Sequence, residues 1–187
     1  MKTTRPRRKS STVSPPRAGP RAPRILRNKS ALPARLPAKL SRIAAGLRSR
    51  PRSGVGVNLA GPDNAVLLAA AQGLARELGV GIARVDLATI ISKYIGETEK
   101  NLRRVFDDAE AKDVLLFFDE ADALFGKRTD IKDAHDRYAN LEIGYLLQRM
   151  EEFAGVVILA TNGRTKIPRA FLRRLRYVVK FPPPKTG

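Results

Sequence analysis

From residue 55 onward, the chain alternates between two patterns of apolar and polar residues: short apolar runs, and longer segments with apolar residues at helical spacing. Five short segments have the length of strands and occupy residues 55–60, 82–86, 114–118, 156–161 and 177–181; all are mostly apolar, although 82–86 also contains Arg84 and Asp86. A run without polar alternation is typical of a strand buried on both faces of a sheet. Residues 114–118, Val-Leu-Leu-Phe-Phe, show this most clearly. We therefore expect that strand to be central and buried.

Helical spacing fills the segments between these runs. Apolar residues recur at intervals of three and four, as they do on one face of a helix. They are Leu67, Ala70, Ala71, Leu74, Ala75 and Leu78 in a first segment, Leu102, Val105, Phe106 and Ala109 in a second, and Ile143, Leu146, Leu147 and Met150 in a third. Gly79 gives the first helix a stop, and the second is expected to start near Glu97. Five strands alternating with helices predict an α/β fold with a five-stranded parallel sheet and flanking helices.

The first third of the chain has a different composition. Of the 187 residues, 1–62 contain 16 basic residues, no acidic residue and nine of the 13 prolines, whereas the rest has 20 basic and 18 acidic residues. Proline disfavours regular structure, and high like charge with few large apolar residues cannot offset the entropy of ordering. We therefore predict a disordered basic tail at 1–54, a folded core at 55–184 and a short tail at 185–187.

One stretch of the predicted tail has helical spacing. At about 38–50, apolar side chains stand three and four residues apart among basic ones, namely Leu40, Ile43, Ala44 and Leu47. A short basic amphipathic helix is one interpretation, although about 13 residues are marginal as a helix without a partner.

Composition excludes several classes of function. The chain has no Cys and a single residue of histidine, His135, so disulfides, thiolate chemistry and His-rich metal sites are excluded or unfavoured. His135 is interpreted as a polar residue at the start of a helix. No apolar run approaches the ~18 residues that cross a bilayer, and no apolar signal segment follows the N-terminus. The acid-free, Arg- and Ser-rich start fits an organelle transit peptide, but its prolines count against that, and we expect a cytoplasmic protein.

The net charge of +18 lies almost wholly in the tail. Such a tail either binds nucleic acid weakly and without sequence preference or is simply solvated. We expect no membrane partner.

Two adjacent carboxylates, Asp119 and Glu120, follow the apolar run 114–118. In α/β folds this end of a strand lies at the edge of the sheet that binds ligands. One carboxylate can hold a hydrated Mg²⁺ while its neighbour polarises a water for attack on a phosphate. The alternative is a strand that ends in two solvated acids.

Further motifs stand in a defined order around this pair. Asn162 directly follows the run 156–161, and a cluster of guanidiniums comes next, from Arg173, Arg174 and Arg176. The motif Lys93-Tyr94-Ile95-Gly96 precedes Asp119 and Glu120 in the chain. In this order and spacing, the chain from about 55 to 184 resembles the P-loop NTPase core of the AAA family of ATPases. It is most similar to the branch that contains proteasomal, protease-linked and severing ATPases and stand-alone bacterial members.

The resemblance implies a role for each motif. Asp119 is similar to the Walker B carboxylate that holds Mg²⁺, Glu120 to the base that activates water, and Asn162 to the residue that orients this water. Arg173 and Arg176 are similar to the arginine fingers that reach the γ-phosphate of a neighbouring subunit. Such fingers imply a homo- or hetero-oligomeric ring, which in this family is usually a hexamer.

The pore-loop motif adds a substrate. Lys93, Tyr94, Ile95 and Gly96 resemble the loop whose aromatic residue grips an extended polypeptide in the central channel. The resemblance therefore implies ATP and Mg²⁺ as cofactors and a remodelled protein as substrate. Two alternatives stay open: Tyr94 as an ordinary rim aromatic, and 173–176 as a solvated basic helix face.

The phosphate-binding loop departs from the family pattern. A Walker A loop reads Gly-x-x-x-x-Gly-Lys-Thr/Ser, and here only Gly61 and Pro62 are retained. Leu67 stands at the lysine position and Leu68 at the hydroxyl position, while Val66 replaces a glycine.

Asp63 and Asn64 are both good N-cap residues for the helix that follows. A carboxylate there would occupy the positive helix end that ordinarily receives phosphate. Each charge-assisted hydrogen bond that is lost is worth roughly 1.5–3 kcal/mol, so we expect impaired binding of nucleotide.

The family core also continues into a helical lid, which we do not expect here because the chain ends at Gly187. Three interpretations follow. The chain is a hydrolysing AAA module of a protein-remodelling machine, a non-hydrolysing subunit that lends Arg173 and Arg176 to an active neighbour, or a truncated remnant without activity.

Overall fold

A twisted six-stranded sheet forms the centre of the protein. The computed structural model describes residues 24–26, 38–48, 54–91, 96–125, 134–164 and 167–183. Its strands are β1 (Arg24–Leu26), β2 (Val55–Ala60), β3 (Gly81–Asp86), β4 (Val114–Asp119), β5 (Val156–Thr161) and β6 (Tyr177–Lys180), in the spatial order β1-β3-β4-β5-β2-β6. The five strands from β2 to β6 pair in parallel, as predicted, and β1 pairs antiparallel with β3. β4 lies between β3 and β5, and all six of its residues are buried.

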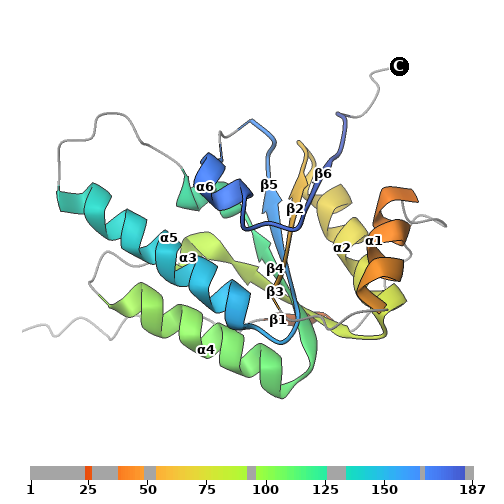
Figure 1. Cartoon of the computed structure of the whole chain (residues 1–187), viewed down its shortest axis with the longest axis horizontal. Helices are drawn as coiled ribbons and strands as arrows, with labels where there is room; N and C mark the ends of the chain where they lie inside the picture. Colours follow the sequence, from red (N-terminus) through yellow and green to blue (C-terminus); the bar gives the residue numbers. More distant parts are fainter. Residues whose placement is uncertain are drawn as a thin grey trace, which may run out of the picture.

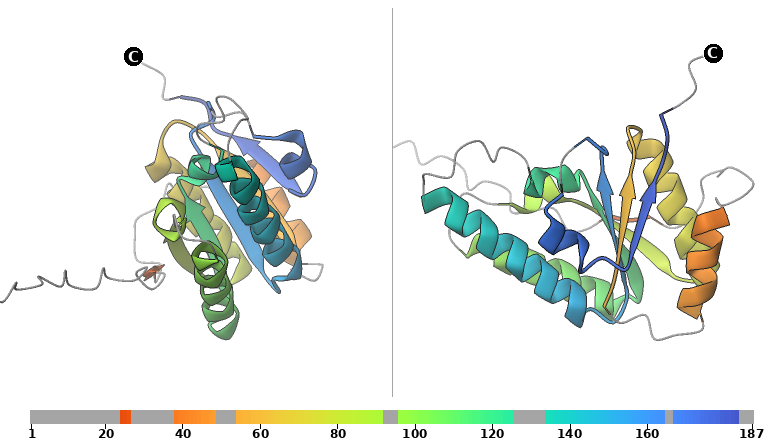
Figure 2. Two further views of the ribbon diagram at one scale, coloured as in Figure 1. Left: turned by 90° about the vertical axis from the view of Figure 1, so that its left-hand side faces the viewer. Right: turned by 45° about the horizontal axis from the view of Figure 1, so that its top comes forward.

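Helices cover both faces of the sheet (Figures 1 and 2). One face carries α1 (Ala38–Arg48) and α2 (Asn64–Leu78). The other carries α3 (Leu87–Ile90), α4 (Glu97–Ala111), the 3₁₀ turn η1 (Ala121–Leu124), α5 (Ala134–Glu152) and α6 (Arg169–Leu172). The three helices predicted from apolar spacing are α2, α4 and α5, and α2 ends at Gly79 in the left-handed conformation (φ 72°).

Alternate residues of the central strand feed two separate apolar cores. Leu115 and Phe117 of β4 pack with α1 and α2, whereas Leu116 and Phe118 pack with α4 and α5. Because successive side chains of a strand point to opposite faces, a strand between two layers of helices has to be apolar at every position. This explains the continuous apolar run at 114–118.

The folded core begins earlier than we predicted. α1 lies inside the predicted tail 1–54, yet its apolar residues Leu40, Ile43, Ala44 and Leu47 are buried against α2 and the sheet. The Nζ of Lys39 donates to the backbone oxygen of Val178 in β6 (2.8 Å), and Arg48 donates to the backbone oxygen of Glu77 in α2 (3.0 Å). The expectation of disorder is wrong for 38–48, because α2 supplies the partner that so short a helix needs.

β1 also lies inside the predicted tail. Its three residues pair with Ile82, Ala83 and Arg84 of β3. A strand of three residues is too short to show an alternation pattern, so periodicity could not predict it. The rest of 1–54, apart from residue 54, lies outside the described residues.

Candidate active site

The carboxyl ends of three neighbouring strands bring the candidate residues to one edge of the sheet. β2 and β5 end in register at Ala60 and Thr161, and the backbone N–H of Gly61 donates to the oxygen of Thr161 (2.9 Å). β4, the other neighbour of β5, ends at Asp119. Gly61, Asp119 and Asn162 therefore lie at the same edge, as we expected from strands that run in parallel.

Asp119 is a buried carboxylate whose two oxygens both accept hydrogen bonds from the chain. Its side chain is 5% exposed. Oδ1 accepts the backbone N–H of Glu120 (3.0 Å). Oδ2 accepts Nε of Arg84 (2.9 Å) and also Nη2 of the same guanidinium. The residue expected to hold Mg²⁺ is thus in an ion pair with Arg84, a residue of the neighbouring strand β3.

Glu120 lies directly after this strand with an unusual backbone. Its φ is 52°, in the left-handed region, and the residue is exposed. A non-glycine residue there costs roughly 1–2 kcal/mol. The turn continues into η1, with the N–H of Ala123 donating to the oxygen of Glu120 (2.9 Å). Glu120, the second acid of the pair, is therefore exposed to solvent, whereas the adjacent Asp119 is buried.

Asn162 is held by a residue to which we had assigned no role. Oδ2 of Asp122, in η1, accepts the backbone N–H of Asn162 (2.7 Å). Oδ1 of Asn162 in turn accepts the N–H of Arg164 (2.7 Å). Asp122 thus joins the end of β4 to the loop after β5. The only sequence signal for it is an acid three residues after Asp119.

The start of α2 is capped from within the chain. Oδ1 of Asp63 accepts the backbone N–H of Ala65 (2.8 Å) and of Val66 (3.3 Å), and its backbone oxygen accepts the N–H of Leu67 (3.2 Å). Asp63 is therefore the N-cap, one of the two candidates that the sequence offered. Because the helix already begins at Asn64, the connection from β2 has only three residues, 61–63.

Apolar packing fills the space beside this connection. Leu67 is fully buried in the α2 core and Leu68 packs against the same core, whereas Val66 is 44% exposed. A Cβ at Gly61 would lie 2.8 Å from Cβ of Phe181 and 3.3 Å from Cδ2 of Leu67. The lysine position of the Walker A pattern is thus part of the hydrophobic core.

These contacts do not fit Mg·ATP as they stand. Two N–H groups at the start of α2 already donate to Asp63, and Leu67 supplies no ammonium. Asp119 is already paired with Arg84.

The candidate arginine fingers lie at and after the end of α6. Arg173 and Arg176 are both exposed, and the guanidinium of Arg176 lies 5.8 Å from the ring centroid of Tyr177. Arg174 between them pairs with Glu151 of α5 (2.9 Å). In the described part of the chain, Arg173 and Arg176 form no ion pair.

Other candidates lie partly outside the described residues. Of the pore-loop motif, Lys93, Tyr94 and Ile95 are not described, and Gly96 precedes α4 in the left-handed conformation (φ 78°). His135 falls in the first turn of α5, where we expected a helix start, but its side chain is not described.

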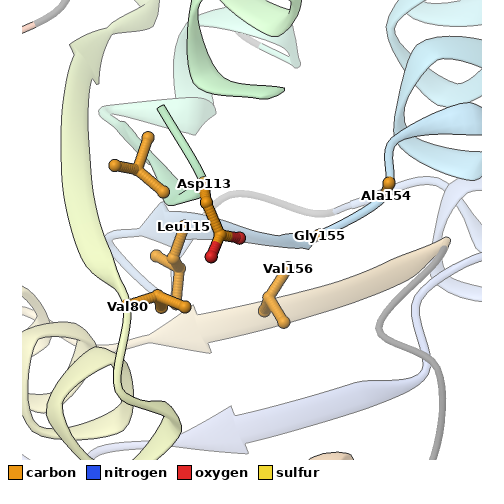
Figure 3. A pocket seen from close by; sticks show the side chains of 7 residues that line it. Val80, Asp113, Leu115, Ala154, Gly155 and Val156 are labelled. Carbon is orange, nitrogen blue, oxygen red and sulfur yellow. The ribbon is translucent and has the colours of Figure 1, made fainter. Parts of the chain in front are cut away.

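A small pocket lies away from these residues (Figure 3). It is lined by residues that precede or begin β3, β4 and β5, with a carboxylate from Asp113. It therefore lies at the opposite edge of the sheet, and none of the candidate residues lines it.

Comparison with known proteins agrees with the fold and the strand-end motifs. Residues 69–183 match the family "ATPase family associated with various cellular activities (AAA)". The chain therefore belongs to the AAA family. The match begins one residue after Leu68, the last Walker A position.

Named relatives cover several kinds of AAA protein. Cell division protein C of Sulfolobus acidocaldarius is 32% identical over 138 residues, which are 68% of this chain and 37% of that protein. Peroxisomal ATPase PEX1 of Cricetulus griseus is 36% identical over 154 residues, 80% of this chain and 12% of that protein. The cell division cycle protein 48 homolog of Archaeoglobus fulgidus is 33% identical over 135 residues, 69% of this chain and 18% of that protein. The chain thus corresponds to a minor part of each relative's length.

Within the described residues, no helix is both long and apolar enough to span a membrane.

Proposed function

We propose that this chain is an AAA module of a ring-forming, protein-remodelling assembly, and that its own binding of ATP is impaired. Family membership and the similarity to the cell division cycle protein 48 homolog and to PEX1 support the first part. The Asp63 cap at the start of α2 is the observation that carries the second part.

The argument for impairment is electrostatic and steric. A helix N-terminus attracts anions because its first N–H groups lack partners inside the helix. Here Oδ1 of Asp63 accepts two of those N–H groups, and its negative charge would repel a triphosphate. The loss of the Walker A lysine removes a charged hydrogen bond worth about 1.5–3 kcal/mol, which corresponds to a ten- to hundredfold loss of affinity.

Calorimetric titration with Mg·ATP tests this proposal. The unmodified chain is expected to give no binding in the micromolar range. A variant with Asp63→Gly, Asn64→Gly, Val66→Gly, Leu67→Lys and Leu68→Thr, which removes the cap and restores the Walker A residues, is expected to regain measurable binding. The matched control carries Leu67→Met in place of Leu67→Lys and is expected to bind at least tenfold more weakly. Micromolar binding by the unmodified chain would refute the impairment.

A second candidate function follows from the exposed arginines. In this version, the chain does not hydrolyse ATP but lends Arg173 and Arg176 to the site of an active neighbour. Their exposure, and the absence of ion pairs to them within the described residues, favour this role. In an active neighbour, residues equivalent to Glu120 and Asn162 would activate and orient the water.

Complementation between two variants tests the lending of arginines. The loop-restored variant with Arg173→Ala and Arg176→Ala has a repaired site but no fingers, and the unmodified chain has fingers but an impaired site. A mixture of the two is expected to hydrolyse ATP faster than either protein alone. The control is Arg169→Ala in the otherwise unmodified chain, because Arg169 is an exposed arginine nearby. This variant is expected to complement as well as the unmodified chain. If no mixture associates or turns over ATP, the remnant interpretation gains support instead.

A further inference from the structure

The guanidinium of Arg84 forms an ion pair with Asp119, the carboxylate that corresponds to the magnesium ligand of the family. Two of its nitrogens, Nε and Nη2, donate to Oδ2 of Asp119. The two residues come from adjacent parallel strands, in which Arg84 of β3 is in register with Phe117 of β4, two residues before Asp119. Because side chains two residues apart share a face of a sheet, Asp119 lies on the same face as Phe117, which packs with α2.

The pairing leaves Asp119 no oxygen without a donor from the chain. Oδ2 is engaged by the guanidinium and Oδ1 by the N–H of Glu120. The position that would supply a hydroxyl ligand is Leu68. The described residues also contain no cluster of three or more acidic, His or Cys side chains that could hold a metal ion.

We propose that Arg84 is the resident cation of this site: its guanidinium takes the place of magnesium beside Asp119, which is an ion-pair partner and not a metal ligand. An arginine suits this role because its guanidinium stays charged at any physiological pH and binds a carboxylate through two nitrogens. It also accounts for the burial of Asp119, since a buried carboxylate without a partner is strongly destabilising. Arg84 acts on the site only through its contacts with Asp119, and its own side chain is 44% exposed.

This inference deepens the proposed function but rests on different contacts. The impairment of nucleotide binding follows from the loop 61–68. The ion pair, by contrast, prevents Asp119 from binding a metal ion even when no nucleotide is present.

Mn²⁺ binding, followed by electron paramagnetic resonance without nucleotide, tests the metal. The unmodified chain and Asp119→Asn are expected to bind Mn²⁺ equally weakly, with no difference up to about 1 mM metal. Binding by the unmodified chain that Asp119→Asn removes would overturn the proposal. Tight ATP binding in calorimetry together with no Asp119-dependent Mn²⁺ binding would refute the impaired loop and leave this inference standing.

A double-mutant cycle in thermal unfolding tests the ion pair. Arg84→Gln and Asp119→Asn are each expected to lower the unfolding midpoint by about 4–8 °C, and the double variant by no more than the worse single variant. Arg104→Gln, an exposed arginine on α4, is the matched control, and its effect should add to that of Asp119→Asn. Additive effects of Arg84→Gln and Asp119→Asn would overturn the pairing. If Arg84→Gln does not fold, Arg84→Lys replaces it in the cycle, and the Mn²⁺ comparison needs neither variant.

Discussion

The carboxylate of Asp63 lies 2.8 Å from the backbone nitrogen of Ala65 and caps the helix on which AAA proteins hold phosphate. The helix therefore starts with a negative charge that belongs to the chain. This charge interacts favourably with the helix dipole and stabilises the helix without a ligand, since an acidic side chain at a helix N-terminus contributes about 0.3–1 kcal/mol.

Removal of this cap is the first prediction. Asp63→Ala is expected to lower the free energy of unfolding by about 1 kcal/mol, because two N–H groups lose their acceptor. Asp63→Asn keeps a capping oxygen and is expected to change it by only a few tenths of a kcal/mol. Urea denaturation of the three proteins measures both values. Equal stability of Asp63→Ala and the unmodified chain would show that the cap does not contribute.

The second prediction concerns the lysine position of the Walker A pattern. Leu67→Ala is expected to destabilise the fold by about 2–5 kcal/mol, because Leu67 is fully buried. Val66→Ala, one residue earlier and 44% exposed, is expected to cost less than about 1 kcal/mol. Chemical denaturation compares the pair. Similar losses for the two variants would contradict the packing of Leu67 in the core.

The third prediction tests whether α1 is part of the folded core. Leu47→Ala removes a buried side chain from the contact with α2 and is expected to cost about 2–4 kcal/mol. The control is Arg42→Ala, at an exposed position of the same helix, which is expected to be nearly neutral. Thermal unfolding distinguishes them. A core that unfolds at the same temperature with either substitution would restore the boundary at residue 54.

The fourth prediction concerns the link between Asp122 and Asn162. Asp122→Ala removes the acceptor for the N–H of Asn162, so this amide is expected to exchange with solvent about tenfold faster. Asp122→Asn keeps an oxygen acceptor and should retain part of the protection. Hydrogen exchange followed by NMR resolves the single amide. Unchanged exchange in Asp122→Ala would mean that other contacts hold the loop.

The fifth prediction concerns the basic N-terminal residues. Affinity for a DNA duplex at low salt is expected to be independent of base sequence and to fall steeply as salt rises, because it would come from released counterions. Deletion of residues 1–22 removes seven basic residues and leaves every described element in place. The slope of log affinity against log salt, measured by fluorescence anisotropy, should become shallower. An unchanged slope would place any binding on the residues after 22.

The main body of the fold was predictable because local patterns and tertiary packing agree there. The apolar runs that became β2, β4 and β5 are buried between helices on both faces, so their composition alone indicates their place in the sheet, whereas β3 and β6 keep exposed residues. α1 was less predictable, since its stability depends on contacts with α2, which a reading of 38–50 alone does not contain. β1 depends on pairing with β3, and its three residues give no periodicity.

The same distinction applies to the candidate site. The cap at Asp63 and the burial of Leu67 could be predicted, because both follow from residue type and position along one helix. The ion pair between Arg84 and Asp119 could not, because 35 residues separate the two and only the register of β3 and β4 brings them together. Asp122 was missed for a similar reason, since its partner Asn162 lies 40 residues away.

The pairing of β1 with β3 also affects how this protein would behave at high concentration. Without β1, the six residues of β3 would form an edge of the sheet, with backbone donors and acceptors available to a strand from another molecule. β1 occupies part of that edge and is itself only three residues long, and the opposite edge, β6, has four residues. Short strands at both edges offer little template for adding further strands. Variants that lose β1 are therefore expected to aggregate more readily, even where the parallel core stays folded.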